Sequence, residues 1–145
     1  AQYKPGYVLM HSQGRPATVQ DDPRYGDVVE DILAFFEERM AQLVRAGLPE
    51  EHIVLDPGIG FGKRTEHNLD ILRRLDRFTS LGRPLYLGIS NKSVFGAVLA
   101  LPVEKRNLAT AVLSALCAAR GARIHRVHDV VGVAAALRLA AAVAA

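Results

Sequence analysis

Four times along the chain, a short apolar run is followed by a stretch with helical periodicity, and this alternation limits the possible folds more than any other feature. The four apolar runs, each predicted to be a strand, span residues 7–10, 52–55, 84–88 and 123–127. Strands that are joined through helices must run parallel, with right-handed crossovers. The sequence therefore predicts an α/β fold, either an open doubly wound sheet or part of a (β/α) barrel.

The stretches between the apolar runs predict the helices, and a loop rich in Gly, Pro and Asp, residues 14–23, precedes the first of them. Helical spacing of apolar residues predicts helices over residues 25–46, 66–78, 94–99 and 103–120, and from residue 129 onward. Four βα units make half of an eight-unit barrel, whose usual length is about 250 residues. At 145 residues and 50% hydrophobic content, the chain can bury one core, so residues 1–145 are predicted to be a single domain.

Polar residues gather immediately after the predicted strands and not after the helices. The four polar clusters span residues 10–14, 56–63, 90–93 and 126–129. In parallel α/β folds the carboxyl ends of the strands meet at one edge, where ligands bind. The clusters are therefore expected to form one site.

The glycine-rich cluster after the second strand does not match a nucleotide-binding loop. Pro57 stands where a P-loop needs glycine, Arg64 follows the lysine, and Lys63 replaces the third glycine of the dinucleotide fingerprint. As a bare pattern it is a tight turn without a ligand role. Asp56, however, ends an apolar strand, where its carboxylate needs hydrogen-bond donors from protein or ligand. The amino and ring N–H groups of a flat heterocycle would satisfy that need.

Two further clusters carry cations that suit an anionic ligand. Lys92 precedes a predicted short helix, a position that favours an anion. Arg126 and His128 are two apart on a predicted strand, so both are expected to reach one phosphate or diphosphate. The alternatives are a surface role for Lys92 and a salt bridge from Arg126 to Asp129.

Composition excludes several classes of protein. The net charge of +3 is spread without a basic run, which argues against nucleic acid as a partner. The most apolar stretch, residues 130–145, is too short to span a bilayer, and residues 1–6 do not resemble a secretory signal. Cys117 is the single cysteine, expected to be a small core residue, and a cytoplasmic location is predicted.

Covalent and metal-centred chemistry also lack candidates in the sequence. The five histidines show no metal-binding spacing, and no GxSxG motif is present. Cys117 lies in the middle of a predicted helix, so it is a poor nucleophile. No protein-ligated metal site is expected within these residues.

Together, the four clusters resemble one family, the dihydropteroate synthases. The runs that carry the resemblance are VLMHSQG (8–14), LDPGIGFGK (55–63), HNL (67–69), GISNKS (88–93) and RVHDV (126–130). They occur in the family's order and spacing and cover essentially the whole chain. The resemblance implies the C-terminal half of a (β/α)8 barrel, strands five to eight, from an enzyme of folate biosynthesis that is a sulfonamide target.

The resemblance also implies the reaction and the residues that bind the pterin. The family condenses 6-hydroxymethyl-7,8-dihydropterin diphosphate with p-aminobenzoate, giving 7,8-dihydropteroate and diphosphate, with Mg²⁺ as a cofactor. By this similarity Asp56 and Lys92 would hydrogen-bond the pterin, Arg126 would lie against its ring, and Met10 would line its pocket. Arg126 and His128 would hold the diphosphate.

The p-aminobenzoate side of the site shows a departure from the family pattern. Phe61, Lys92 and Ser93 would contact p-aminobenzoate, but Asn91 stands where the family usually has arginine. This change removes a cation beside the subsite.

Nothing in the chain matches the family's N-terminal motifs, which supply the metal-associated asparagine. The isolated chain is therefore expected to be inactive, with the Mg²⁺ ligand in the other half of the barrel, and to pair through its free strand edges as a homodimer. Two alternatives remain: a non-catalytic half-barrel that binds pterin or assembles, and the pterin-binding domain of a corrinoid-linked methyltransferase.

Overall fold

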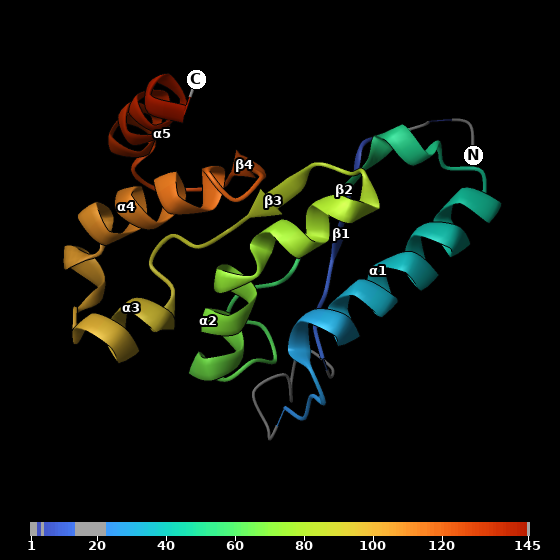
Figure 1. Cartoon of the computed structure of the whole chain (residues 1–145), viewed down its shortest axis with the longest axis horizontal. Helices are drawn as coiled ribbons and strands as arrows, with labels where there is room; N and C mark the ends of the chain where they lie inside the picture. The colour runs from blue at the N-terminus through green and yellow to red at the C-terminus, as the bar shows by residue number, and fades with distance from the viewer. Residues whose placement is uncertain (1–2, 4, 14–22, 145) are drawn as a thin grey trace.

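A single parallel sheet organises the chain, for which a computed structural model describes residues 3, 5–13 and 23–144. Within these residues the sheet has four strands in the order β1-β2-β3-β4 (Figure 1). The strands are β1 (Tyr7–Met10), β2 (Ile53–Asp56), β3 (Leu85–Leu87) and β4 (Ala122–His125). Each strand pairs with its successor in the sequence, which is the order of a barrel segment, whereas a doubly wound sheet reverses its order at a switch point.

Helices separate the strands, as the periodicity predicts. The α-helices are α1 (Val28–Arg45), α2 (Thr65–Arg73), α3 (Ser93–Leu99), α4 (Asn107–Ala118) and α5 (Val130–Ala144). Short 3-10 helices span Glu50–His52, Leu75–Leu81 and Val103–Lys105. Among the described residues, no helix combines the length and apolar character needed to cross a membrane.

The first helix begins three residues later than predicted. Asp27 accepts hydrogen bonds from the backbone N–H groups of Val29 (2.9 Å) and Glu30 (3.2 Å), and so caps the N-terminus of α1. An aspartate in this position satisfies backbone donors that have no partner within the helix. The predicted loop before this helix falls mainly on residues 14–22, which lie outside the described residues.

Two long helices that the periodicity predicts are in fact divided. The helix predicted over 66–78 ends at Arg73, and a 3-10 helix continues it, in which Leu75 and Phe78 are buried three residues apart. A spacing of three matches one 3-10 turn, so the apolar pattern continues although the helix type changes. The helix predicted over 103–120 is divided in the same way, and its α-helical part starts at Asn107.

The fourth strand is shorter than predicted and ends at His125. The Arg126 N–H still donates to the Leu87 carbonyl (2.9 Å), but Leu87 is the last residue of β3. β3 therefore offers no further residue with which β4 could pair, and residues 126–128 form a loop.

One face of the sheet is covered by helices and the other is open. On the covered face Leu55 and Leu87 are fully buried beneath Phe36 of α1 and Phe78, whose rings meet edge to face at 6.0 Å. In Figure 1, α1, α2 and α4 follow one another along this layer, while α5 lies beside α4. The other face presents partly exposed residues, including Met10 (39% exposed), and it leads to the carboxyl ends of the strands.

We expect Phe36→Ala to destabilise the protein by about 3–5 kcal/mol, because it removes a fully buried ring from the centre of the core. Leu139→Ala, on α5 and 68% exposed, should change the free energy of unfolding by less than about 0.5 kcal/mol. Urea denaturation followed by circular dichroism measures both values. Equal effects of the two substitutions would contradict the core described above.

Candidate functional site

A cavity of about 270 Å³ lies at the carboxyl ends of the strands, where the sequence predicts the site. Five of the predicted site residues line it: Met10, Asp56, Phe61, Lys92 and Arg126. Val8, Ile59, Tyr86 and Gly88 complete the lining. These residues come from all four strands or from the loops that follow them, so the predicted convergence of the strand ends is confirmed for these five.

Asp56 is the buried acidic group of the cavity. It is the last residue of β2 and only 7% exposed, and its Oδ1 accepts a hydrogen bond from the Gly58 N–H at 2.8 Å. Among the described residues, Oδ2 accepts no hydrogen bond. Burial raises the pKa of Asp56, although the Gly58 N–H and the charges of Lys92 and Lys63 act in the opposite direction. The carboxylate is thus a positioned acceptor beside the cavity.

Lys92 and Phe61 bring two loops together across the cavity. The Lys92 Nζ lies 3.9 Å from the centroid of the Phe61 ring, a cation–π contact. Gly60 has φ +79°, and a Cβ added to it would lie 3.2 Å from Lys92 Cδ, so the loops touch where glycine permits it. Burial lowers the pKa of Lys92, as does Arg126, while Asp56 raises it.

His128, Asn91 and Ser93 do not line the cavity. The His128 Nδ1 lies 2.8 Å from the Ser90 Oγ and 3.3 Å from the Asn91 Nδ2, which places this imidazole against the loop after β3. Ser93 is exposed as the first residue of α3.

The expectation that Arg126 and His128 share a strand face is wrong, because β4 ends before both of them. The alternative salt bridge from Arg126 to Asp129 is not formed among the described residues. The Asp129 Oδ1 instead accepts the Gly132 N–H (3.0 Å) in the first turn of α5.

Arg106 supports the Lys92 loop, a role that the sequence did not predict. Its Nη1 donates to the carbonyls of Asn91 (2.8 Å) and Lys92 (3.2 Å), and its Nε donates to that of Leu101 (3.0 Å). Asn91 has φ +61°, a left-handed conformation that asparagine adopts more readily than most residues. Because the partners are backbone carbonyls, no side-chain motif in the sequence could have revealed this contact.

Lys63 and His11 form a buried pair under the loop after β2; the sequence placed both in the polar clusters but assigned a binding role to neither. The Lys63 Nζ lies 3.0 Å from the His11 Nδ1, and the two residues are 5% and 7% exposed. Burial lowers the pKa of Lys63 to about 7, opposed by the charge of Asp56. Burial and the Lys63 charge lower the pKa of His11 to about 3, so its imidazole is neutral at pH 7.

The donor set of the cavity does not fit Mg²⁺. Asp56 is the one carboxylate in its lining, which also includes the cations Lys92 and Arg126. Within the described part of the chain, no group of three or more His, Cys, Asp or Glu residues could hold a metal ion. Mg²⁺ prefers several oxygen ligands in an octahedral arrangement. The participation of Mg²⁺ stays a prediction.

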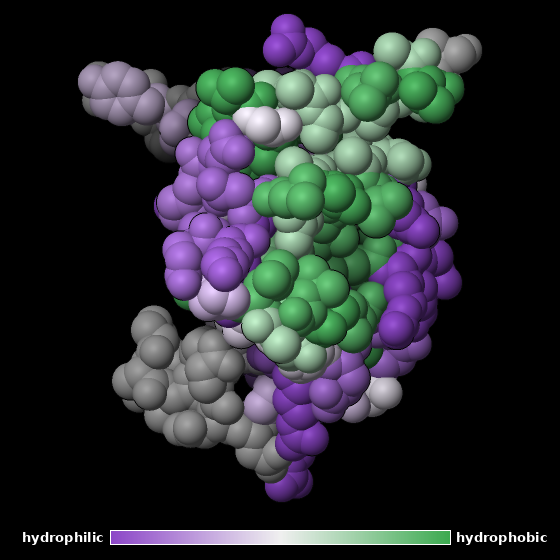
Figure 2. Space-filling view, turned by 90° about the vertical axis from the view of Figure 1, so that its left-hand side faces the viewer, coloured by the Kyte–Doolittle hydropathy of each residue, from purple (hydrophilic) through white to green (hydrophobic). Residues whose placement is uncertain are grey.

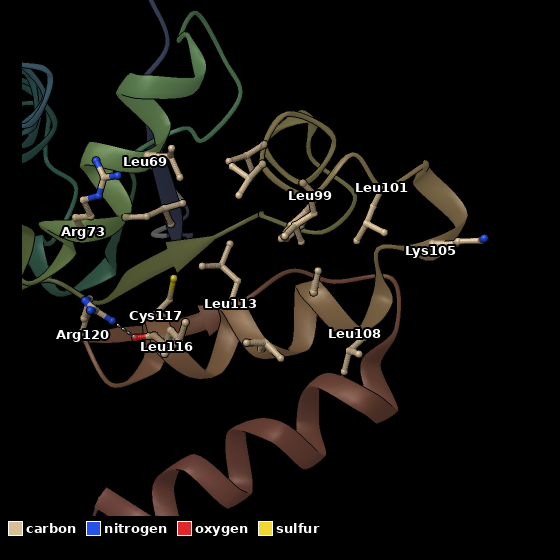
Figure 3. A pocket seen from close by; sticks show the side chains of 16 residues that line it. Leu69, Arg73, Leu99, Leu101, Lys105, Leu108, Leu113, Leu116, Cys117 and Arg120 are labelled. Carbon is tan, nitrogen blue, oxygen red and sulfur yellow. Dashed lines mark hydrogen bonds between the residues drawn. The ribbon is translucent and has the colours of Figure 1, made fainter.

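A larger hollow, of about 640 Å³, lies on the outer side of the helices, where α2, α3 and α4 meet (Figure 3). Its lining is mainly leucine and valine, and Cys117 lies at its base. Burial raises the pKa of Cys117 to about 11, so the group is a thiol at neutral pH and not a nucleophile. Cys117 is buried near the C-terminal end of α4, and its predicted role as a core residue is confirmed. We call this hollow the outer groove; the charged groups in its lining are the cations Arg73, Lys105 and Arg120, and its lining includes no carboxylate or histidine.

Comparison with known sequences relates the chain to enzymes that bind pterins. The profile of the family described as "Pterin binding enzyme" matches residues 1–128. The dihydropteroate synthase of Haemophilus influenzae is 43% identical over 122 residues, which cover 84% of this chain and 44% of that protein. The chain thus spans less than half the length of this curated relative.

Solved structures show the same relationship. A Yersinia pestis dihydropteroate synthase, in complex with a sulfonamide drug, superposes with a TM-score of 0.92 at 36% identity, covering 94% of this chain and 50% of that chain. The Xanthomonas albilineans dihydropteroate synthase, in complex with 7,8-dihydropteroate, gives a TM-score of 0.86 at 37% identity, covering 95% of this chain and 51% of that one. Because these enzymes are TIM barrels, the predicted half-barrel fold is confirmed, as is the resemblance that the motifs indicated.

The neutral state of His11 leads to a prediction about acid stability. Between pH 6.5 and 3 the unfolded chain protonates His11 while the folded protein does not, so stability falls as the pH falls through this range. His11→Asn keeps an acceptor near the position of Nδ1 but cannot be protonated. As the pH is lowered, the free energy of unfolding of His11→Asn should fall less steeply than that of the unmodified protein, by up to about 1.4 kcal/mol per pH unit.

Urea denaturation at several values between pH 7.5 and 4.5 provides the test. The curves of the two proteins should run parallel above the ordinary pKa of histidine, about 6.5, and diverge below it. Parallel curves over the whole range would contradict a buried neutral imidazole.

Proposed function

The chain belongs to the pterin-binding enzyme family, and on that basis we propose that its activity is that of a dihydropteroate synthase. The reaction would join 6-hydroxymethyl-7,8-dihydropterin diphosphate to p-aminobenzoate, giving 7,8-dihydropteroate and diphosphate. The observation that carries the proposal is the buried Asp56 carboxylate, which lies in one small cavity with Lys92 and Arg126. The named relatives support the same reaction, and they favour it over a corrinoid-linked methyltransferase.

The chemistry of a pterin ring suits this cavity. One edge of the ring presents an amino group and ring N–H donors, which an acceptor such as Asp56 can bind in pairs. The Lys92 ammonium can donate to the ring carbonyl and ring nitrogen. Burial makes such bonds selective, because a ligand without matching donors would leave the carboxylate unpaired. Arg126 and Met10 would lie against the ring.

The reaction itself needs orientation more than covalent help from the protein. The p-aminobenzoate nitrogen attacks the exocyclic methylene carbon, the C–O bond to diphosphate breaks, and the amine loses a proton. Phe61, which lines the cavity and is 38% exposed, would position p-aminobenzoate together with Ser93 and Asn91. Arg126 and His128 would stabilise the leaving diphosphate, which is where negative charge develops.

We expect Asp56→Asn and Lys92→Met each to weaken the binding of 6-hydroxymethylpterin by roughly 10- to 100-fold, the loss expected when a hydrogen bond to a charged group is removed. Isothermal titration calorimetry of the purified protein measures this affinity. Asp76→Asn, which alters an exposed carboxylate, is the matched control and should bind like the unmodified protein. Tight pterin binding that survives both substitutions in the cavity would refute the proposed site.

A homodimer and a cytoplasmic location belong to the same proposal, but we propose an apolar patch on the helices as the contact between copies, in place of the free strand edges expected from the sequence. The lone cysteine suits a reducing compartment.

A patch of exposed apolar side chains surrounds the outer groove, and Figure 2 shows it as a hydrophobic area on the side of the molecule formed by α3, α4 and α5. Val98, Leu99, Leu108, Val112 and Leu116 are each more than half exposed there. Patches of this kind mark association surfaces, and a second copy of the chain is the proposed partner.

If the outer groove joins two copies, sedimentation should give a molar mass of twice the 15.7 kDa of one chain. Leu108→Arg places a charge in the patch and should shift the protein to monomer, without loss of fold because Leu108 is 78% exposed. Val44→Arg, at a site on α1 that is 42% exposed and outside the groove lining, is the control. Sedimentation velocity that gives one chain for the unmodified protein would refute the homodimer.

A further inference from the structure

Lys63 is buried among backbone carbonyl groups in a way that an ordinary structural lysine is not. Its Nζ donates to the carbonyls of Phe61 (3.0 Å), Gly58 (3.1 Å) and His11 (3.3 Å), and it also lies 3.0 Å from the His11 Nδ1. Burying an ammonium is costly unless hydrogen bonds replace its water. Four acceptors around three N–H donors meet that requirement.

Each of these carbonyls belongs to a residue that lines the cavity or is hydrogen-bonded to Asp56, although Lys63 itself does not line the cavity. Gly58 donates its N–H to the Asp56 carboxylate, so the residue that orients Asp56 is itself held by Lys63. Phe61 carries the ring that lies under the Lys92 ammonium. His11 continues the strand ladder, with its N–H on the Asp56 carbonyl at 2.9 Å.

The geometry around Gly58 shows how closely these segments approach. Gly58 has φ +70°, and a Cβ added there would lie only 1.9 Å from the His11 carbonyl oxygen. Other polar groups of the same loop have different partners: the Gly60 N–H donates to the Asn68 Oδ1, and the Gly62 carbonyl accepts from the Tyr25 hydroxyl. Together with the Tyr25 hydroxyl, Lys63 ties the loop after β2 to the segment after β1, and it does so through three backbone carbonyls.

We propose that Lys63 is a positioning residue of the ligand site, which sets the geometry of Asp56 and Phe61 by binding the carbonyl groups of Gly58, Phe61 and His11. It acts through these residues and does not touch the ligand. The inference rests on the proposed pterin site for its effect on binding, but the contacts of Lys63 with the backbone can be tested without a ligand.

The test uses Lys63→Met, which keeps the length of the side chain and removes its donors. Arg45→Met, at an exposed cation of α1 outside the linings of the cavity and the outer groove, is the control. Lys63→Met should weaken 6-hydroxymethylpterin binding roughly 10- to 100-fold, the range known for groups that orient ligand-binding side chains in metal sites. It should also speed hydrogen exchange of the Gly58 amide at least about tenfold, because the loop that buries this hydrogen bond loosens. The Phe36 amide in α1 should exchange as in the unmodified protein.

Each result leads to a decision. Unchanged pterin affinity together with unchanged Gly58 exchange would overturn the inference, even if the free energy of unfolding fell, because a purely structural lysine predicts that outcome. If Lys63→Met does not fold, Lys63→Gln, which keeps a shorter donor, is measured instead and should give a smaller loss in the same two quantities. If the unmodified protein fails to bind pterin, the proposed function is refuted, and Gly58 exchange alone decides the role of Lys63.

Discussion

The burial of one carboxylate at the end of a parallel strand is the constraint on which the rest of the site depends. Asp56 is 7% exposed and raised in pKa by that burial, so every donor near it matters. The protein supplies one donor directly, the Gly58 N–H at 2.8 Å, and places the cations Lys92 and Lys63 nearby. The remaining acceptor capacity faces a cavity, and this is what makes the carboxylate a recognition group and not only a structural one.

Besides Arg126, three cations around this site have different tasks because they have different partners. Lys92 faces the cavity and the Phe61 ring, where a ligand can reach it. Lys63 and Arg106 are committed to backbone carbonyls, the first in the loops after β1 and β2, the second in the loop after β3. When a loop is buried, its backbone carbonyl and N–H groups need hydrogen-bond partners to replace water, and these side chains supply them. Lys63 and Arg106 thus hold in place the loops that carry Phe61 and Lys92.

The arrangement of the sheet explains why these loops meet at all. Strands in sequential order keep the helices on one face and bring all four carboxyl ends to one edge. The covered face holds the core around Phe36 and Phe78, while the open face carries Met10 and leads to the cavity. Stability and recognition are therefore assigned to opposite sides of the same strands, and substitutions on the two sides should have separable effects.

The sequence by itself determined the order of the strands and helices, the family, and the five cavity residues Met10, Asp56, Phe61, Lys92 and Arg126, because periodicity is local and strand ends in parallel folds share an edge. It misplaced helix and strand ends, where capping by Asp27 and the short length of β3 decide the boundary. Only the tertiary structure decided the roles of Lys63 and Arg106. Both bind backbone carbonyls, which every residue possesses, so nothing in the order of side chains could reveal those contacts.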